Sequence, residues 1–284
     1  MRVPTHLGRG SGSVLIRLGY ELVYRCPQDV PMMLMLNVHP VRAGDLVRPD
    51  TLVISPAVAQ REYRDGFGNT CVRIVARAGT TTLTADALIK DNAYPDLVMP
   101  AARQYAVEDL PDEALVFLLS SRYCETELLL QTAWKLFGTA PLGWARVQTI
   151  CDFVNAHIQF DYAYADPTRT AFRGYAERRG VCRDFAHLAV ALCRCMNIPA
   201  RYCTGYIGDI GVPAVDAPMD FAAWFEAYLE GGWYTFDPRN NASMPRLGRT
   251  LIARGRDAAD VAIATTFGEA NLDSFRVWAD EVAK

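Results

Sequence analysis

The chain lacks a long apolar run and lacks an excess of positive charge. Its longest apolar tract, residues 30–38, is interrupted by Pro31 and Asn37, whereas a membrane-spanning helix needs about 20 apolar residues. The 29 lysines and arginines are outnumbered by 32 aspartates and glutamates, which gives a net charge of −3. We therefore expect neither a membrane span nor a nucleic-acid partner, because a nucleic-acid partner requires a basic surface.

Several other signatures are missing as well. The sequence has no phosphate-cradling glycine loop, no dinucleotide fingerprint and no export signal. Its eight cysteines match no disulfide framework, so we expect free thiols in a cytoplasmic protein. Cys193 and Cys195 are only a weak signal for a metal site. No second ligand cluster accompanies them, and their thiols point about 200° apart on a helix. We expect no metal site.

What is present is ample material for a folded core, since hydrophobic residues make up 51% of the chain. We interpret residues 1–12 as a flexible leader and residues 13–92 as an antiparallel β-sandwich, because short alternating strands are separated by polar turns. Residues 93–111 contain three prolines and are expected to form a linker. Residues 112–284 are expected to form an α+β domain with a C-terminal extension.

The pattern of each region predicts individual elements. In the first region we expect strands at 14–24, 32–41, 52–54, 60–64, 70–75 and 80–89. In the second region the period becomes helical, and we expect helices at 112–119, 125–137, 144–158 and 182–196. Strands are then expected at 200–207, 222–229 and 233–236, and the remaining tail has mixed character.

The segment Gly180-Val181-Cys182-Arg183-Asp184-Phe185-Ala186 carries the most chemical information. A glycine turn brings Cys182 to the start of an apolar helix, where unpaired N–H groups and the helix dipole favour a thiolate. The thiolate is the nucleophilic form of cysteine. Cysteine is also among the most often buried residue types, so a structural role for Cys182 is the alternative.

A nucleophilic thiol needs a base, and the base needs a group that orients it. Asp237 ends the strand Trp233-Tyr234-Thr235-Phe236 and precedes Pro238, so its carboxylate can project from a strand edge into a cleft. An ordinary Asp-Pro turn is the alternative.

These segments resemble the transglutaminase-like superfamily, in particular bacterial cysteine proteases with an N-terminal β domain. The resemblance covers residues 110–240 and includes Gly180–Ala186, Ile198–Arg201, Gly205-Tyr206, Ala223–Tyr228 and Gly232–Pro238. It implies an α+β core in which the helix that carries the cysteine packs on a sheet. It also implies a Cys-His-Asp triad that acts on amide bonds without a cofactor, with Cys182 as nucleophile and Asp237 as orienting acid.

The chain departs from this family at one position. The family's histidine directly precedes the Ala-Trp pair, and here that position is Ala222. A methyl group can neither accept a proton nor pair with a thiolate. The four histidines elsewhere are His6 in the leader, His39 in the β region, His157 at a helix end and His187. His187 follows Cys182 by five residues and points about 140° away from it around the helix.

Two functions remain open. The first is a cysteine hydrolase or acyl transferase whose activity is weak or altered, and the second is an inactive binding or scaffold protein with the same fold. In both cases we expect a peptide or protein in the cleft, with Trp224, Glu226 and Trp233 as substrate-binding residues. The alternative is that these aromatic residues lie in a sheet and fill a core with their side chains. The sequence does not determine the oligomeric state.

Overall fold

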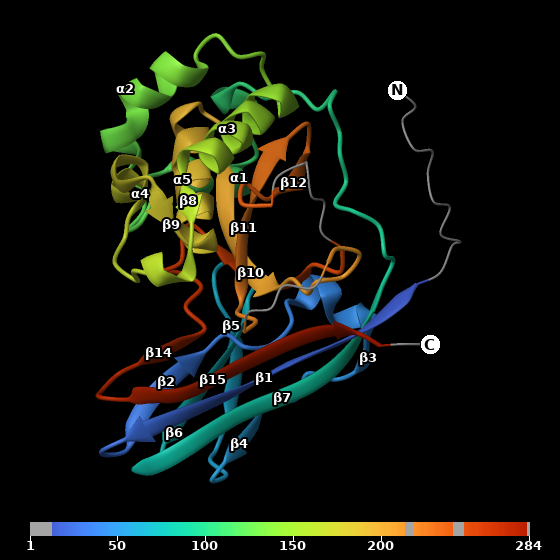
Figure 1. Ribbon diagram of the computed structural model, residues 1–284, viewed down its shortest axis with the longest axis vertical. Helices are drawn as coiled ribbons and strands as arrows, with labels where there is room; N and C mark the ends of the chain where they lie inside the picture. The colour runs from blue at the N-terminus through green and yellow to red at the C-terminus, as the bar shows by residue number, and fades with distance from the viewer. Residues whose placement is uncertain (1–12, 214–217, 241–246, 283–284) are drawn as a thin grey trace.

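The computed structural model describes residues 13–213, 218–240 and 247–282 (Figure 1). Two antiparallel sheets form one part of the molecule, and a third antiparallel sheet with five α-helices in its described residues forms the other. The α+β fold expected from the sequence is therefore confirmed. The leader, residues 1–12, lies outside the described residues.

The β part is a sandwich whose two sheets share one apolar core. Along β1 the side chains of Ile16, Leu18, Tyr20 and Leu22 alternate into this core, as expected for a strand with one buried face. The first sheet has the order β15-β1-β7-β3, with β4 also paired to β7, and the second has the order β14-β2-β6-β5. The bounds are β1 Val14–Cys26, β2 Val30–Leu34, β3 Leu46–Arg48, β4 Val53–Ser55, β5 Arg61–Arg64, β6 Thr70–Ala76 and β7 Gly79–Asp91.

One strand in this part is shorter than the sequence predicts. We expected a strand over 32–41, but β2 ends at Leu34, and a short 3-10 helix, η1 (Pro40–Asp45), begins soon after it. Proline has no N–H to donate to a strand ladder, and its fixed φ suits the first position of a helix. The His39 imidazole caps η1 by accepting from the N–H of Val41.

The last two strands return to the sandwich. Strand β14 (Ala264–Thr266) pairs with β2, and β15 (Asn271–Glu281) pairs with β1 over most of its length. The sequence analysis groups these residues with the second domain, and the pairing places them in the first. A strand pattern shows that one face is buried, but it does not identify the partner strand.

The second part surrounds a central helix, α5 (Cys182–Cys195), which packs on β10 and β11 and is covered by α2, α3 and α4. The third sheet has the order β12-β11-β10-β13. Bounds of the remaining elements are α1 Asp112–Leu115, η3 Val116–Leu118, α2 Thr126–Phe137, α3 Trp144–His157, β8 Gln159–Phe160, η4 Tyr162–Tyr164, α4 Ala171–Glu177, β9 Arg179–Gly180, β10 Ala200–Tyr206, β11 Ala222–Leu229, β12 Gly232–Phe236 and β13 Thr250–Gly255.

The segment between β7 and α1 runs from the sandwich to the helical part (Figure 1). Apart from the short 3-10 helix η2 (Val107–Asp109), residues 93–111 contain no helix or strand. Arg103 in this segment forms an ion pair with Glu230, with the nitrogen and oxygen 3.2 Å apart. The segment is thus fastened to the turn between β11 and β12.

Candidate active site

Cys182 is the first residue of α5. A contact between the residue before it and the first turn of the helix determines how the backbone enters α5. The N–H of Val181 donates to the Asp184 carboxylate over 2.8 Å, which satisfies one of the N–H groups that a helix start leaves unpaired. A side chain on Gly180 would collide with that carboxylate. Glycine is therefore required at position 180 for this turn into the helix.

Asp184 is itself held from outside the helix. Its side chain is 1% exposed and forms an ion pair with Arg169, whose Nη1 lies 3.2 Å from the carboxylate. The same nitrogen donates to the carbonyl of Tyr164 over 2.6 Å. These contacts tie the loop before α4 to the start of α5, and they fix the position of Cys182.

The Cys182 side chain lines a pocket of about 750 Å³. It is partly exposed, whereas the other seven cysteines are buried. The pocket lies between the two parts of the molecule, because Ala279–Glu281 of β15 line one side of it and the start of β11 lines another. The close approach of the two parts depends on Gly208, where a side chain would meet the backbone of Ala279.

The thiol of Cys182 is held in its protonated form. Burial, the largest cause, and the nearby Asp220 carboxylate together raise its pKa to about 11, although a hydrogen bond from the N–H of Ala223 opposes both. The thiolate expected from the helix start is therefore wrong for this state of the protein. Desolvation and a neighbouring negative charge both disfavour a thiolate, and here they outweigh the favourable N–H groups.

Ala222 is the residue that the family resemblance identifies with the imidazole position. It lines the same pocket as Cys182, and the N–H of the next residue, Ala223, contacts the sulfur. The position that the sequence identifies is thus beside the thiol, and its side chain is a methyl group without acid–base chemistry.

None of the histidines in the described residues replaces it. His187 is fully buried, and its Nε2 accepts from the N–H of Ala258 over 3.1 Å. Its ring stacks on Tyr123 with the centroids 5.3 Å apart, and it also packs on Tyr202. Burial holds the pKa of His187 well below its ordinary value, so it stays neutral underneath the site.

The other described histidines lie in other parts of the fold. The Nε2 of His157 is 2.8 Å from the carbonyl of Tyr175, between stacked aromatic rings. His39 is buried beside η1, where burial and the nearby Arg254 lower its pKa to about 4. His6 lies outside the described residues.

Asp237 ends β12 as expected, but its carboxylate is already occupied. One oxygen accepts from the N–H of Asn240 over 3.0 Å, and the other accepts from the Asn240 side-chain amide over 2.8 Å. Arg249 donates to that second oxygen over 3.0 Å. Burial opposes ionisation, but Arg249 and Asn240 outweigh it and hold the pKa of Asp237 below its ordinary value.

Asn240 connects this carboxylate with the pocket. It lines the pocket beside Cys182, and its side-chain oxygen accepts from Arg239 over 3.0 Å. Asp237 itself is not among the described residues that line the pocket. The sequence analysis missed Asn240, although its place three residues after Asp237 is typical of a side chain that closes an aspartate turn.

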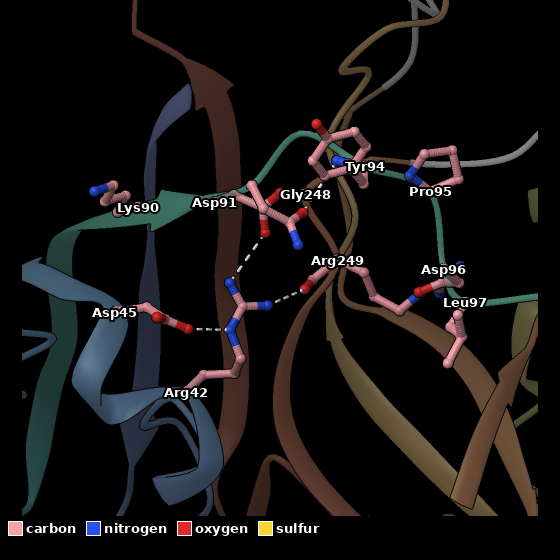
Figure 2. Close-up of a pocket in the computed structure, with 11 residues that line it drawn as sticks. Arg42, Asp45, Lys90, Asp91, Tyr94, Pro95, Asp96, Leu97, Gly248 and Arg249 are labelled. Atoms are coloured by element: carbon pink, nitrogen blue, oxygen red, sulfur yellow. Dashed lines mark hydrogen bonds and ion pairs between the residues drawn. The ribbon is translucent and has the colours of Figure 1, made fainter. Parts of the chain in front are cut away.

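Arg249 was also missed, and it connects Asp237 with the interdomain segment. Its Nε forms a second ion pair with Asp96 at 3.1 Å, and its guanidinium lies 4.6 Å from the ring centroid of Trp224. Figure 2 shows Arg249 at the edge of a second, smaller pocket of about 370 Å³. There Arg42 of the sandwich donates to the Arg249 carbonyl over 2.8 Å and also pairs with Asp91.

The three residues expected to bind substrate lie outside the Cys182 pocket. Trp224 is 1% exposed, beneath the Arg249 guanidinium. Glu226 forms an ion pair with Arg201 at 2.5 Å, and Arg201 lies 4.0 Å from the ring centroid of Trp233. These side chains build the outer face of the third sheet. Their positions favour the alternative interpretation, in which the aromatic residues of the sheet fill a core.

The cysteine pair on α5 is structural in this arrangement. Cys193 and Cys195 are both buried, and the Cys195 thiol donates to the carbonyl of Thr126 over 3.4 Å. Across residues 13–213, 218–240 and 247–282, no three His, Cys, Asp or Glu side chains gather closely enough to hold a metal ion. In the same ranges no helix is long and apolar enough to cross a membrane.

Comparison with known proteins agrees with the fold of this part of the chain. Residues 132–238 match the profile of the transglutaminase-like superfamily. A solved protein of Cytophaga hutchinsonii, described as a “Putative Cysteine Protease”, superimposes with a TM-score of 0.79 at 29% identity, covering 96% of this chain and 92% of that one.

The matches to mycobacterial proteins cover a smaller share of this chain. An uncharacterized protein of Mycobacterium tuberculosis is 29% identical over 234 residues, which is 74% of this chain and 73% of the relative. An uncharacterized protein of Mycobacterium leprae is 38% identical over 86 residues, which is 30% of each chain. The described fold agrees with the profile match, in which residues 132–238 of this chain are similar to the core domain of the transglutaminase-like superfamily.

Proposed function

We propose that the pocket beside Cys182 binds a peptide or protein segment and that this chain does not turn it over efficiently. The observation that carries the proposal is that Ala222, whose side chain is a methyl group, lines the pocket with Cys182 at the position where the family resemblance implies an imidazole. With a pKa of about 11, about one thiol in 10⁴ is ionised at pH 7. Removing a positioned acid–base group typically costs about 10² to 10⁴ in rate.

The Asp237 contacts support the same conclusion. An orienting carboxylate acts by accepting a hydrogen bond from the base, and here both Asp237 oxygens accept from Asn240, with Arg249 as a further donor. These contacts stabilise the turn after β12 and leave the pocket intact. A pocket of about 750 Å³ falls within the usual range for ligand sites.

The experiment that tests the proposal is a screen of peptides and isopeptides by mass spectrometry. Wild-type protein and Cys182→Ala are each measured for binding and for cleavage or cross-linking. We expect ligands that bind both proteins, with no product from either. Product formed by the wild type and absent with Cys182→Ala would overturn the proposal.

A slow cysteine acyl transferase is the second candidate, because two groups near the sulfur favour it. The Ala223 N–H favours the thiolate, and N–H groups at a helix start can stabilise an oxyanion. Asp220 supplies a carboxylate near the thiol. Its side chain reaches solvent, but desolvation by the pocket walls raises the pKa of Asp220. A carboxyl group with a raised pKa is a better proton acceptor.

Asp220→Asn separates the two candidates. If Cys182 is a nucleophile that uses this carboxylate, the variant loses its residual turnover and still binds a neutral peptide. If the domain only binds, neither protein forms product.

A further inference from the structure

The Cys182 pocket combines an apolar floor with an acidic rim. The floor is formed by buried side chains that include Ile207, Ile210 and Phe221. The charged residues that line the pocket are Asp161, Asp209, Asp220, Asp280, Glu281 and Arg239. Asp209 has an interaction partner of its own, and the other four carboxylates outnumber the single guanidinium of Arg239.

Much of this negative charge is uncompensated. Within the described residues, no ion pair engages Asp161, Asp220 or Glu281. Asp280 lies across the strand pair from Arg17, but Arg17 donates to Asp86 over 2.9 Å. A concave surface of one sign with low-dielectric walls concentrates the electrostatic potential inside it. The rim therefore attracts cations and repels anions.

A second, independent observation shows which chemistry the pocket wall accepts. The guanidinium of Arg239 lies 3.9 Å from the ring centroid of Phe160, and both residues line the pocket. The face of an aromatic ring attracts a cation electrostatically. One basic side chain of the protein itself is thus already stacked against this wall, with the exposed ring of Tyr162 beside it.

We propose that the pocket selects peptide segments carrying lysine or arginine side chains. This inference rests on the proposed peptide-binding function and specifies its ligand class. The apolar floor receives the aliphatic stems of such side chains, and the rim carboxylates receive their charged ends, because long basic side chains bury their stems and keep the head group in water. An acidic peptide meets the like charges of the rim carboxylates, which disfavours it.

The experiment measures anisotropy of three labelled peptides of equal length, one rich in lysine and arginine, one neutral and one rich in glutamate. Wild-type protein is compared with Asp161→Asn/Asp220→Asn, which removes two rim charges. The matched control is Glu108→Gln/Asp109→Asn, which removes two charges from η2, outside the pocket lining. We expect the rim variant to weaken binding of the basic peptide at least tenfold and the control to change it less than twofold.

Protection of Cys182 from iodoacetamide localises the bound peptide. The basic peptide should slow alkylation of Cys182 at pH 9, and the glutamate-rich peptide should not. Equal loss of binding in the rim and control variants would overturn the inference, as would equal affinity for all three peptides. If a neutral peptide protects Cys182 to the same extent as the basic peptide, the charge preference is refuted and the proposed peptide binding stands. Product formation in the same samples would instead refute the proposed function.

Discussion

Asp237 and Arg249 form an ion pair in the interior, with 3.0 Å between the Arg249 Nη2 and the carboxylate and 8% exposure of each side chain. The arginine therefore engages the carboxylate to which the family resemblance assigns the orienting role. Through its second ion pair with Asp96, the same arginine links the end of β12 to the segment that joins the two parts of the molecule.

Replacing Arg249 with methionine should destabilise the protein strongly. The variant leaves Asp237 buried without its counter-ion, and breaking a buried pair on one side costs about 3–5 kcal/mol. Urea unfolding measures the change in the free energy of unfolding. The control is Arg103→Met, which breaks an exposed pair with Glu230 and should cost less than about 1 kcal/mol. Equal losses in both variants would contradict the role given to Arg249.

Asp237 should make stability depend on pH in the acid range. Its pKa in the folded protein lies below the ordinary 3.8, so the stabilisation is fully present above that value and is lost as pH falls through the folded pKa. The neutral variant Asp237→Asn removes this dependence. We expect the wild type to have a higher midpoint temperature of thermal unfolding than the variant at pH 6. This difference in midpoint temperature should narrow only as the pH approaches 2. A difference that is constant with pH would show that the carboxylate is not ionised in the folded protein.

Alkylation of Cys182 should be slow at neutral pH and should accelerate with pH. Because the thiolate is the reactive form and the pKa is about 11, the rate should rise about tenfold per pH unit from pH 7 toward that value. Peptide mass spectrometry after iodoacetamide treatment follows the modification, with Cys182→Ala as the blank. Rapid modification below pH 7 would indicate an activated thiolate and would favour the acyl-transfer candidate.

Introducing histidine as Ala222→His should make the thiol more reactive. An imidazole at this position lies beside the sulfur, and an adjacent imidazolium lowers a thiol pKa by at least about 1 unit. Since Asp237 remains bound to Asn240 and Arg249, only part of a triad would be restored. Ala222→Gln is the matched control, because it adds a polar side chain without a titrating group. If both variants react alike with iodoacetamide, the gain does not come from the imidazole.

Gly180→Ala should destabilise the start of α5. The added methyl would meet the Asp184 carboxylate, and overpacking of this kind costs about 1–3 kcal/mol. At Gly44 a side chain would meet nothing within 4 Å, so Gly44→Ala should change stability by less than about 0.5 kcal/mol. Denaturant unfolding of the two variants tests whether the glycine before Cys182 is required by packing.

The local pattern was enough to place most elements of the second half. The predicted strand at 222–229 coincides with β11, and the predicted helices at 125–137, 144–158 and 182–196 differ from α2, α3 and α5 by one residue at an end. Helix periodicity, caps and breakers are properties of neighbouring residues, and they are therefore visible in a single sequence. The short helix α4 was not predicted, because seven residues carry too little periodic signal.

The sequence by itself predicted the three residues of the candidate site: Cys182 at a helix start, Ala222 in place of an imidazole, and Asp237 at a strand end. The structure places Cys182 and Ala222 in one pocket. Only the tertiary structure decided their chemistry. Burial and Asp220 keep the thiol protonated. Arg249, directly before β13, binds the Asp237 carboxylate, and β15 returns from the C-terminal end to complete the pocket. The pKa values and ion pairs depend on distances between segments far apart in the chain, which are set only when the whole chain packs.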